Sequence, residues 1–247
     1  MAVALNTVFE NAWGSQTSPA AFVSNTGTTP GTVAANANRV LIAFMCFSWT
    51  TTGPSTVAVT WAGNAMTQIG SAVVLTAKYA VYCFGLHTDA SITTGNQTIS
   101  GSWTGGDATM IALDLGAICF DGADQTDGWV AAHNTSGNAT ANPATLTVTT
   151  TSGNAVAVGG CNDNGAAPSI SSGTSGWMNG GFNGNYFAGY ALSDASSEVI
   201  SWTTGVVEYG LIGVDVLAVG AGGGGDAQEW MSRNAPGKSN RFFHTGY

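Results

Sequence analysis

Residues of the types that usually perform catalysis are few and scattered in this chain. Its three histidines, His87, His133 and His244, lie far apart in a sequence of 247 residues. Serine is abundant, but no Gly-x-Ser-x-Gly turn is present to position a serine nucleophile, and no phosphate-binding glycine loop occurs. We therefore expect structural roles for the histidines, no catalytic residues, no cofactor and no enzymatic activity.

Carboxylates are the next candidates for chemistry. Asp114 and Asp215 interrupt apolar stretches, where an unpaired charge would be costly. They are either the acid and base of a glycosidase or side chains that reach solvent or a backbone partner. Asp121, Asp124 and Asp127 are three positions apart, whereas an EF-hand places its ligands at every second position. A loop calcium site and a solvated turn both fit this spacing; we favour the turn and predict no metal site.

Four cysteines, Cys46, Cys83, Cys119 and Cys161, each lie in or at the end of a strand-like stretch. None belongs to a Cys-x-x-Cys pair, which disfavours a zinc site. Two interpretations stay open. The cysteines are either buried free thiols that act as small apolar residues, or they form one or two disulfides whose pairing the sequence does not fix.

Alternating apolar and polar residues recur along residues 1–219 and predict strands. In residues 55–61, for example, Val57, Val59 and Trp61 share one face and threonines share the other. Pairs such as Gly63-Asn64 separate these stretches and favour tight turns. No stretch has helical periodicity. We predict an all-β fold, an antiparallel β-sandwich of the jelly-roll type, with an extended C-terminal tail.

Three predicted strands, within residues 39–49, 79–86 and 109–120, are apolar on both faces. An antiparallel strand of this kind should be covered on both sides. Either N-terminal and loop segments of the same chain cover the second face, or another subunit does. The second alternative predicts self-association, for example as a trimer.

Residues 220–225 are nearly all glycine and predict a hinge between the sandwich and residues 226–247. The segment after the hinge is too short to fold alone, yet it is rich in aromatic and basic side chains, which often anchor interfaces. We predict that it is a docking arm, ordered only against a partner. Its predicted partner-docking residues are Trp230, Met231, Arg233, Lys238, Arg241, Phe242, Phe243 and Tyr247.

A long polar loop at residues 162–184 could contact carbohydrate. Aromatic rings in such a loop can stack on sugars while amides bind hydroxyl groups, and the candidates are Trp177, Phe182 and Asn183. The alternative is that Trp177 folds back onto the core.

Net charge and composition restrict the partners. The net charge of −9, with only 8% charged residues, disfavours nucleic acid, which requires clustered Lys and Arg. The N-terminal residues have no signal-peptide pattern, and no apolar stretch is long enough to span a membrane. We expect synthesis in a host cytoplasm. The Thr-, Gly- and Asn-rich composition suits a protein that later works outside cells, as virion proteins do.

Three segments resemble a known family. Residues 34–42, residues 57–67 and residues 122–127 are similar to turn and core segments of a jelly-roll domain family found in bacteriophage structural proteins and bacterial surface proteins. The resemblance covers about residues 20–219 and implies a fold; it brings no catalytic residues.

These observations together predict an accessory structural protein of a bacteriophage virion. We expect a capsid decoration (cement) protein or a head or tail appendage, bound non-covalently to copies of itself and to the major capsid or other virion proteins. The alternative is a glycan-binding module of a tail tip or cell surface, with a host-surface glycan as its partner.

Overall fold

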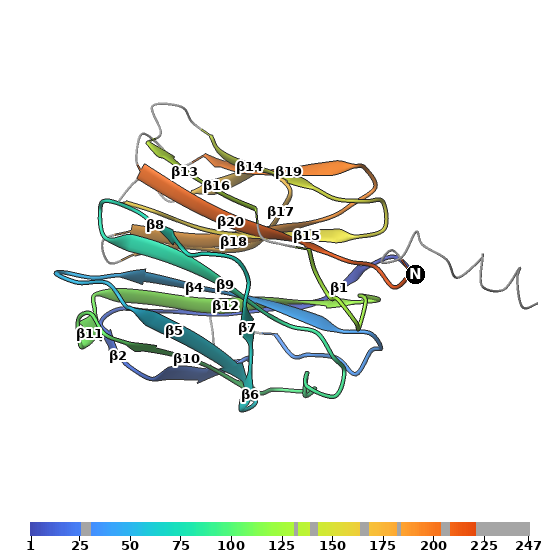
Figure 1. Cartoon of the computed structure of the whole chain (residues 1–247), viewed down its shortest axis with the longest axis horizontal. Helices are drawn as coiled ribbons and strands as arrows, with labels where there is room; N and C mark the ends of the chain where they lie inside the picture. Colours follow the sequence, from blue (N-terminus) through green and yellow to red (C-terminus); the bar gives the residue numbers. More distant parts are fainter. Residues whose placement is uncertain are drawn as a thin grey trace, which may run out of the picture.

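The computed structural model describes residues 1–25, 31–130, 133–138, 143–163, 168–181, 184–203 and 208–220. All regular elements in this part of the chain are antiparallel strands, which confirms the predicted all-β sandwich character. Four sheets lie on top of one another, with a hydrophobic core between each neighbouring pair (Figure 1).

The first half of the chain forms two of these sheets. The first inner sheet has the order β1 (Ala4–Trp13), β12 (Ala112–Asp121), β4 (Val40–Ser48), β9 (Tyr79–Leu86) and β7 (Thr67–Gln68), with β8 (Val73–Val74) also paired to β9. The first outer sheet has the order β3 (Ala20–Val23), β10 (Thr98–Thr104), β5 (Thr56–Trp61) and β6 (Asn64–Ala65). A short ribbon pairs β2 (Gln16–Thr17) with β11 (Thr109–Met110).

The second half forms the other two sheets. The second inner sheet has the order β13 (His133–Asn138), β20 (Glu208–Val216), β15 (Ala155–Asn162), β18 (Gly184–Leu192) and β17 (Thr174–Gly181). The second outer sheet has the order β14 (Ala144–Thr149), β19 (Ser197–Thr203) and β16 (Ser169–Ser172).

The inner strands are buried on both faces because a sheet covers each side. All nine residues of β4 are buried. Leu41 and Phe47 belong to the core beneath the first outer sheet, whereas Ile42 and Phe44 belong to the middle core between the two inner sheets. The second face of β4 is therefore covered by the second half of the same chain. We had expected loop segments or another subunit there, and this face is not available for self-association.

The two halves have the same strand order. In the first half β1-β12-β4-β9 faces β3-β10-β5, and in the second half β13-β20-β15-β18 faces β14-β19-β16. The register agrees as well. Phe44 pairs with Cys83 and Gly116 on its neighbouring strands, and Gly159, at the equivalent place on β15, pairs with Ala188 and Ile212.

Short sequence similarities fall at equivalent places in the two halves. They are Pro19-Ala20 and Pro143-Ala144 before β3 and β14, Cys46 and Cys161 on β4 and β15, and Thr88-Asp89-Ala90-Ser91 and Ser193-Asp194-Ala195-Ser196 after β9 and β18. We call residues 1–122 and 123–219 the first and second repeats. Residues 1–219, which we expected to form one sandwich, thus contain two stacked sandwiches.

The repeats pack as the subunits of a twofold-symmetric dimer would. Strand β1 of the first repeat lies against β17 of the second, and β8 lies against β13, which is the counterpart of β1. Strand β1 and its counterpart β13 thus each contact the other repeat, as equivalent segments do in an isologous interface.

One pair of side chains breaks this symmetry at its centre. Phe44 and Gly159 occupy equivalent positions of the two repeats and face each other across the middle core. A Cβ atom added to Gly159 would lie 2.3 Å from ring atoms of Phe44. The glycine therefore leaves the space that the phenylalanine fills, where two phenylalanines would compete.

We predict that Gly159→Val lowers the free energy of unfolding by at least about 1–3 kcal/mol, because the added methyl groups overlap the Phe44 ring. Phe44→Ala should cost about 3–5 kcal/mol through the cavity it leaves. In the double variant valine fills part of that cavity, so the combined loss should be smaller than the sum. Urea unfolding measures all three values; additive losses would contradict this packing.

Candidate functional site

The two ends of the body meet at one end of the stack. The N-terminal ammonium donates to the carbonyl oxygen of Val219 (3.2 Å), and the Val219 N–H donates to the carbonyl of Gly122 (2.9 Å), at the junction of the repeats. The N–H of Val3 donates to the carbonyl oxygen of Gly153 (2.7 Å). We call this region, residues 1–3, 121–130, 152–154, 192–196 and 217–220, the terminal pole (Figure 1).

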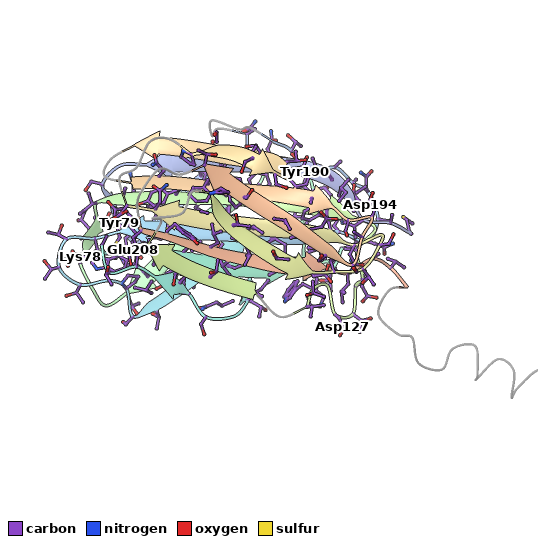
Figure 2. The ribbon with its side chains drawn as sticks, turned by 90° about the horizontal axis from the view of Figure 1, so that it is seen from above. Lys78, Tyr79, Asp127, Tyr190, Asp194 and Glu208 are labelled. Atoms are coloured by element: carbon purple, nitrogen blue, oxygen red, sulfur yellow. The ribbon has the colours of Figure 1, made fainter. Side chains whose placement is uncertain are left out.

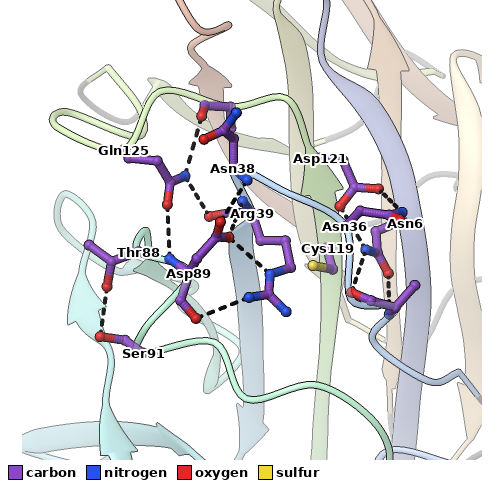
Figure 3. Close-up of polar contacts among 12 residues, drawn as sticks. Asn6, Asn36, Asn38, Arg39, Thr88, Asp89, Ser91, Cys119, Asp121 and Gln125 are labelled. Atoms are coloured by element: carbon purple, nitrogen blue, oxygen red, sulfur yellow. Dashed lines mark hydrogen bonds and ion pairs between the residues drawn. The ribbon is translucent and has the colours of Figure 1, made fainter.

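A buried guanidinium supports the terminal pole (Figure 3). Arg39 is 7% exposed, and its Nε donates to Asp89 Oδ1 at 3.0 Å. The same carboxylate accepts the backbone N–H groups of Arg39 (2.8 Å) and Asn38 (2.9 Å). Gln125, from the segment between the repeats, donates to the Arg39 carbonyl (3.0 Å) and accepts the Asp89 N–H (2.9 Å). This network holds the inter-repeat segment on the first repeat.

The ionised form of Asp89 is stabilised within the network. Burial raises the pKa of Asp89, but hydrogen bonds from the backbone of Arg39 and Asn38 and from the guanidinium outweigh burial, so this pKa lies below its ordinary value. The contribution to stability is present above the pKa of an unfolded aspartate and is lost as the pH falls through the folded value.

Asp215 has a comparable structural role in the second repeat. It is 3% exposed and accepts hydrogen bonds from Asn154 Nδ2 (3.1 and 2.9 Å) and Thr150 Oγ1 (2.5 Å). Asn154 also accepts the backbone N–H of Ala218 (2.9 Å). These contacts fix the end of β20 to the turn before β15.

Asp114 and Asp215 do not form an acid and base pair. On β12, Asp114 alternates with Leu113 and Leu115 of the first outer core and therefore faces the middle core. On β20, Val214 and Val216 face the middle core, so Asp215 faces the second outer core. The second inner sheet lies between the two carboxylates, and the glycosidase alternative is wrong.

Two of the three aspartates near the repeat junction, Asp121 and Asp124, accept hydrogen bonds through their carboxylates. Asp121 accepts hydrogen bonds from Asn6 (2.7 Å) and Asn36 (2.6 Å), and Asp124 accepts the backbone N–H groups of Thr126 (2.7 Å) and Asp127 (3.0 Å). The contacts of Asp124 are those of a hydrogen-bonded turn, whereas Asp121 binds two asparagines that are distant in the sequence. The described residues contain no group of three or more His, Cys, Asp or Glu side chains placed to hold a metal ion.

All four cysteines are buried free thiols, which resolves the alternative left open by the sequence. Burial raises the pKa of Cys83, Cys119 and Cys161 far above that of an exposed thiol. Burial likewise raises the pKa of Cys46, with smaller contributions from Cys161 and Asp114. Because the thiolate is the reactive form, these cysteines are packing residues rather than nucleophiles.

Trp177 cannot serve as a sugar platform. It lies on β17 with 4% of its surface exposed, and its ring centroid is 6.2 Å from that of Phe44 in the middle core. The alternative in which Trp177 packs on the core is confirmed, and our assignment of it to a glycan site is wrong because no ring face is accessible. Phe182 and Asn183 lie outside the described residues.

The predicted docking residues of the tail also lie outside the described part of the chain. These are Trp230, Met231, Arg233, Lys238, Arg241, Phe242, Phe243 and Tyr247. Among the histidines, His87 packs edge-on against Trp129, with ring centroids 5.0 Å apart. Sequence reasoning missed the Arg39–Asp89–Gln125 network, although the duplicated Asp-Ala-Ser segment could have drawn attention to Asp89.

Comparisons with known proteins add no family. No family model, curated protein or solved structure matches the chain. The family resemblance noted in the sequence therefore stays a prediction. Within the described residues, no helix has the length and apolar character needed to cross a membrane.

We predict that Asp89→Asn lowers the free energy of unfolding by about 2 kcal/mol at pH 7, because Arg39 stays buried beside a neutral partner. This loss of stability is smaller than the loss expected for a fully buried ion pair, because the Asp89 side chain is 40% exposed. Asp194→Asn, at the equivalent but exposed position of the second repeat, is the matched control and should change stability by less than about 0.5 kcal/mol.

The same variants give a pH test. Stability of the wild-type protein should decline below about pH 4, and Asp89→Asn should show a shallower decline, since it lacks a group that gains a proton on unfolding. Equal pH slopes in denaturant titrations of the two proteins would refute this role of Asp89.

Proposed function

We propose that this chain is a non-enzymatic accessory structural protein of a bacteriophage particle, a capsid decoration protein or a head or tail appendage. In this proposal residues 226–247 attach it non-covalently to the particle. The observation that carries the proposal is the separation of two parts. One is a body in which the central strands β4 and β15 of the inner sheets are buried on both faces, and the other is a basic, aromatic segment that follows the terminal pole in the sequence.

We also propose that each repeat is a jelly roll. Numbered along the chain, the strands β1, β3, β4, β5, β6, β9, β10 and β12 of the first repeat are first to eighth. The inner sheet then has the order first, eighth, third, sixth, and the outer sheet has the order second, seventh, fourth, fifth. This is the strand order of a jelly roll, a fold common in viral shells. The second repeat follows it, except that β17 pairs with β18.

Several features support a body that acts as a rigid support. The exposed faces of the outer strands carry mainly Thr, Ser, Ala and Val, for example Thr56, Ala58 and Thr60 on β5 and Thr145, Thr147 and Thr149 on β14. The buried carboxylate of Asp215 binds neighbouring side chains, as does that of the half-buried Asp89. These are properties of a durable scaffold.

The composition of residues 226–247 supports attachment through the tail. Aromatic side chains and arginine dominate the binding energy of protein interfaces. Three of the five Lys and Arg residues of the chain are in this segment, which favours an acidic partner surface on a neighbouring copy, the major capsid protein or another virion protein. Since the middle core occupies the second face of β4, oligomerisation would depend on the tail rather than on that face.

A glycan-binding function is not proposed. It was based on Trp177, which is buried in the middle core, and no other described residue has been assigned to it.

The experiment is incorporation into particles that lack this protein. We predict that the triple variant Trp230→Ser, Phe242→Ser, Phe243→Ser reduces incorporation at least tenfold, since the loss of about 1.4 kcal/mol of binding energy is sufficient. Val74→Ser with Val199→Ser, which removes exposed apolar side chains from the body, is the matched control and should incorporate normally.

Co-sedimentation with purified particles measures both variants. Melting temperatures should be unchanged in each, because Val74 and Val199 are exposed and the three described cores are complete without residues of the tail. Normal incorporation of the tail variant would overturn the proposed attachment, and a wild-type protein that never binds particles would overturn the proposed function.

A further inference from the structure

We propose that the terminal pole is itself a docking surface, and that its occupant is residues 226–247 of the same chain. The proposal deepens the proposed function and rests on it: before assembly, the arm would be stored on its own body and then released to the particle.

Exposed apolar side chains gather at the terminal pole. Among the described residues, seven large hydrophobic side chains are exposed, and four of them are at this pole: Met1 (77%), Leu192 (49%), Val130 (45%) and Val219 (36%). A hollow of about 300 Å³ lies between residues 1–2, 152–153 and 218–220. The pole therefore offers an apolar contact area of the kind that aromatic side chains cover.

The terminal pole is also acidic. Asp127 and Asp194 are exposed there, and Asp124 is half-buried. The two basic side chains of the described residues cannot neutralise these groups. Arg39 is bound to Asp89, and Lys78 lies at the opposite end of the stack, where it donates to the Thr50 carbonyl (Figure 2). Apart from the N-terminal ammonium, no cation of the described body lies at this pole.

The repeat provides a more specific argument about Asp194. In the first repeat the equivalent residue, Asp89, binds the guanidinium of Arg39. In the second repeat the position of Arg39 is occupied by Asn154, which instead binds Asp215. The hydrogen bonds around the two aspartates differ. The Asp89 carboxylate accepts the N–H groups of Asn38 and Arg39, whereas the Gly153 N–H donates to the Ser193 carbonyl (2.9 Å) and the Asn154 N–H to the Thr151 carbonyl (3.0 Å). The Asp194 carboxylate is exposed at the equivalent position, and its own repeat contains no Lys or Arg that could pair with it.

The tail supplies what this surface lacks. It contains Arg233, Lys238 and Arg241 together with aromatic residues, and only residues 221–225 separate it in the sequence from Gly220 at the pole. Arg233 is thirteen positions beyond Gly220 in the sequence, a reach of roughly 40 Å when extended, so Asp194 is within reach of the tail. A tail joined to its own body by so few residues has an effective concentration of about 1 mM, which favours the chain's own tail over that of a second copy.

Paramagnetic labelling of the full-length protein tests the proposal. Because all four natural cysteines are buried, Thr245→Cys gives one accessible thiol for a spin label. We expect broadening of amide signals from residues 124–128 and 192–196, and little at residues 76–78 of the opposite end. Uniform broadening, or none at the pole, would overturn the proposal.

Mixing separates the chain's own tail from that of a second copy. Spin-labelled unenriched protein is mixed with isotope-enriched unlabelled protein, and we expect no broadening at the pole. Broadening that occurs only between chains would overturn the assignment to the same chain.

Charge reversal tests the contact with Asp194. We expect Asp194→Lys to lower the docking equilibrium constant roughly threefold, the effect of an exposed charge pair, and Arg233→Glu with Arg241→Glu to restore docking in that background. Ala58→Lys, an exposed position on β5, is the matched control and should leave docking unchanged. Unchanged broadening in Asp194→Lys would overturn the role of Asp194.

The incorporation assay distinguishes this inference from the proposed function. If the tail binds particles but not the pole, the proposed storage contact is wrong and the proposed function stands. If the tail binds the pole but not particles, the proposed function is wrong and the pole remains the docking surface of the tail.

Discussion

Burial of both faces of the two inner sheets is the constraint on which the rest of the structure depends. On β4 and β15 neighbouring side chains enter different cores, so each strand is buried at every position and is apolar except at its last residue, Ser48 or Asn162. Such strands are stable only between two other layers. Neither repeat can expose its inner sheet to water, and the chain therefore folds as one stack although it contains two similar units.

Polar contacts close the seam between the repeats at both ends. At the terminal pole, Gln125 ties the inter-repeat segment to Arg39 and Asp89. At the other end, the Glu208 carboxylate of the second repeat accepts the N–H groups of Thr76 (2.8 Å) and Ala77 (3.0 Å) of the first. Burial raises the pKa of Glu208, but these bonds outweigh burial and lower it. Arg39, Asp89 and Glu208, which are among the few charged residues of the body, thus stabilise its shape.

The sequence predicted the strands, the burial of β4 on both faces and the free cysteines as one of two alternatives. It did not predict what covers β4, because alternation reports that a face is buried but not what buries it. The repeat was not found because the two halves share only short segments, such as residues 88–91 and 193–196. Trp177 was assigned to a polar loop, since the bulge and pairing that bring it into the middle core are set by β18. The Arg39 network depends on contacts between distant segments.

The central claim is that a rigid body of two stacked repeats is attached to a virus particle by its C-terminal arm. Cryo-microscopy of purified particles that contain this chain tests it most directly. The account predicts four-layered density held on the particle through density that begins at residues 217–220, with both outer sheets facing away from the shell. Particles that lack the chain, or a body bound through an outer sheet with the arm making no contact, would contradict it.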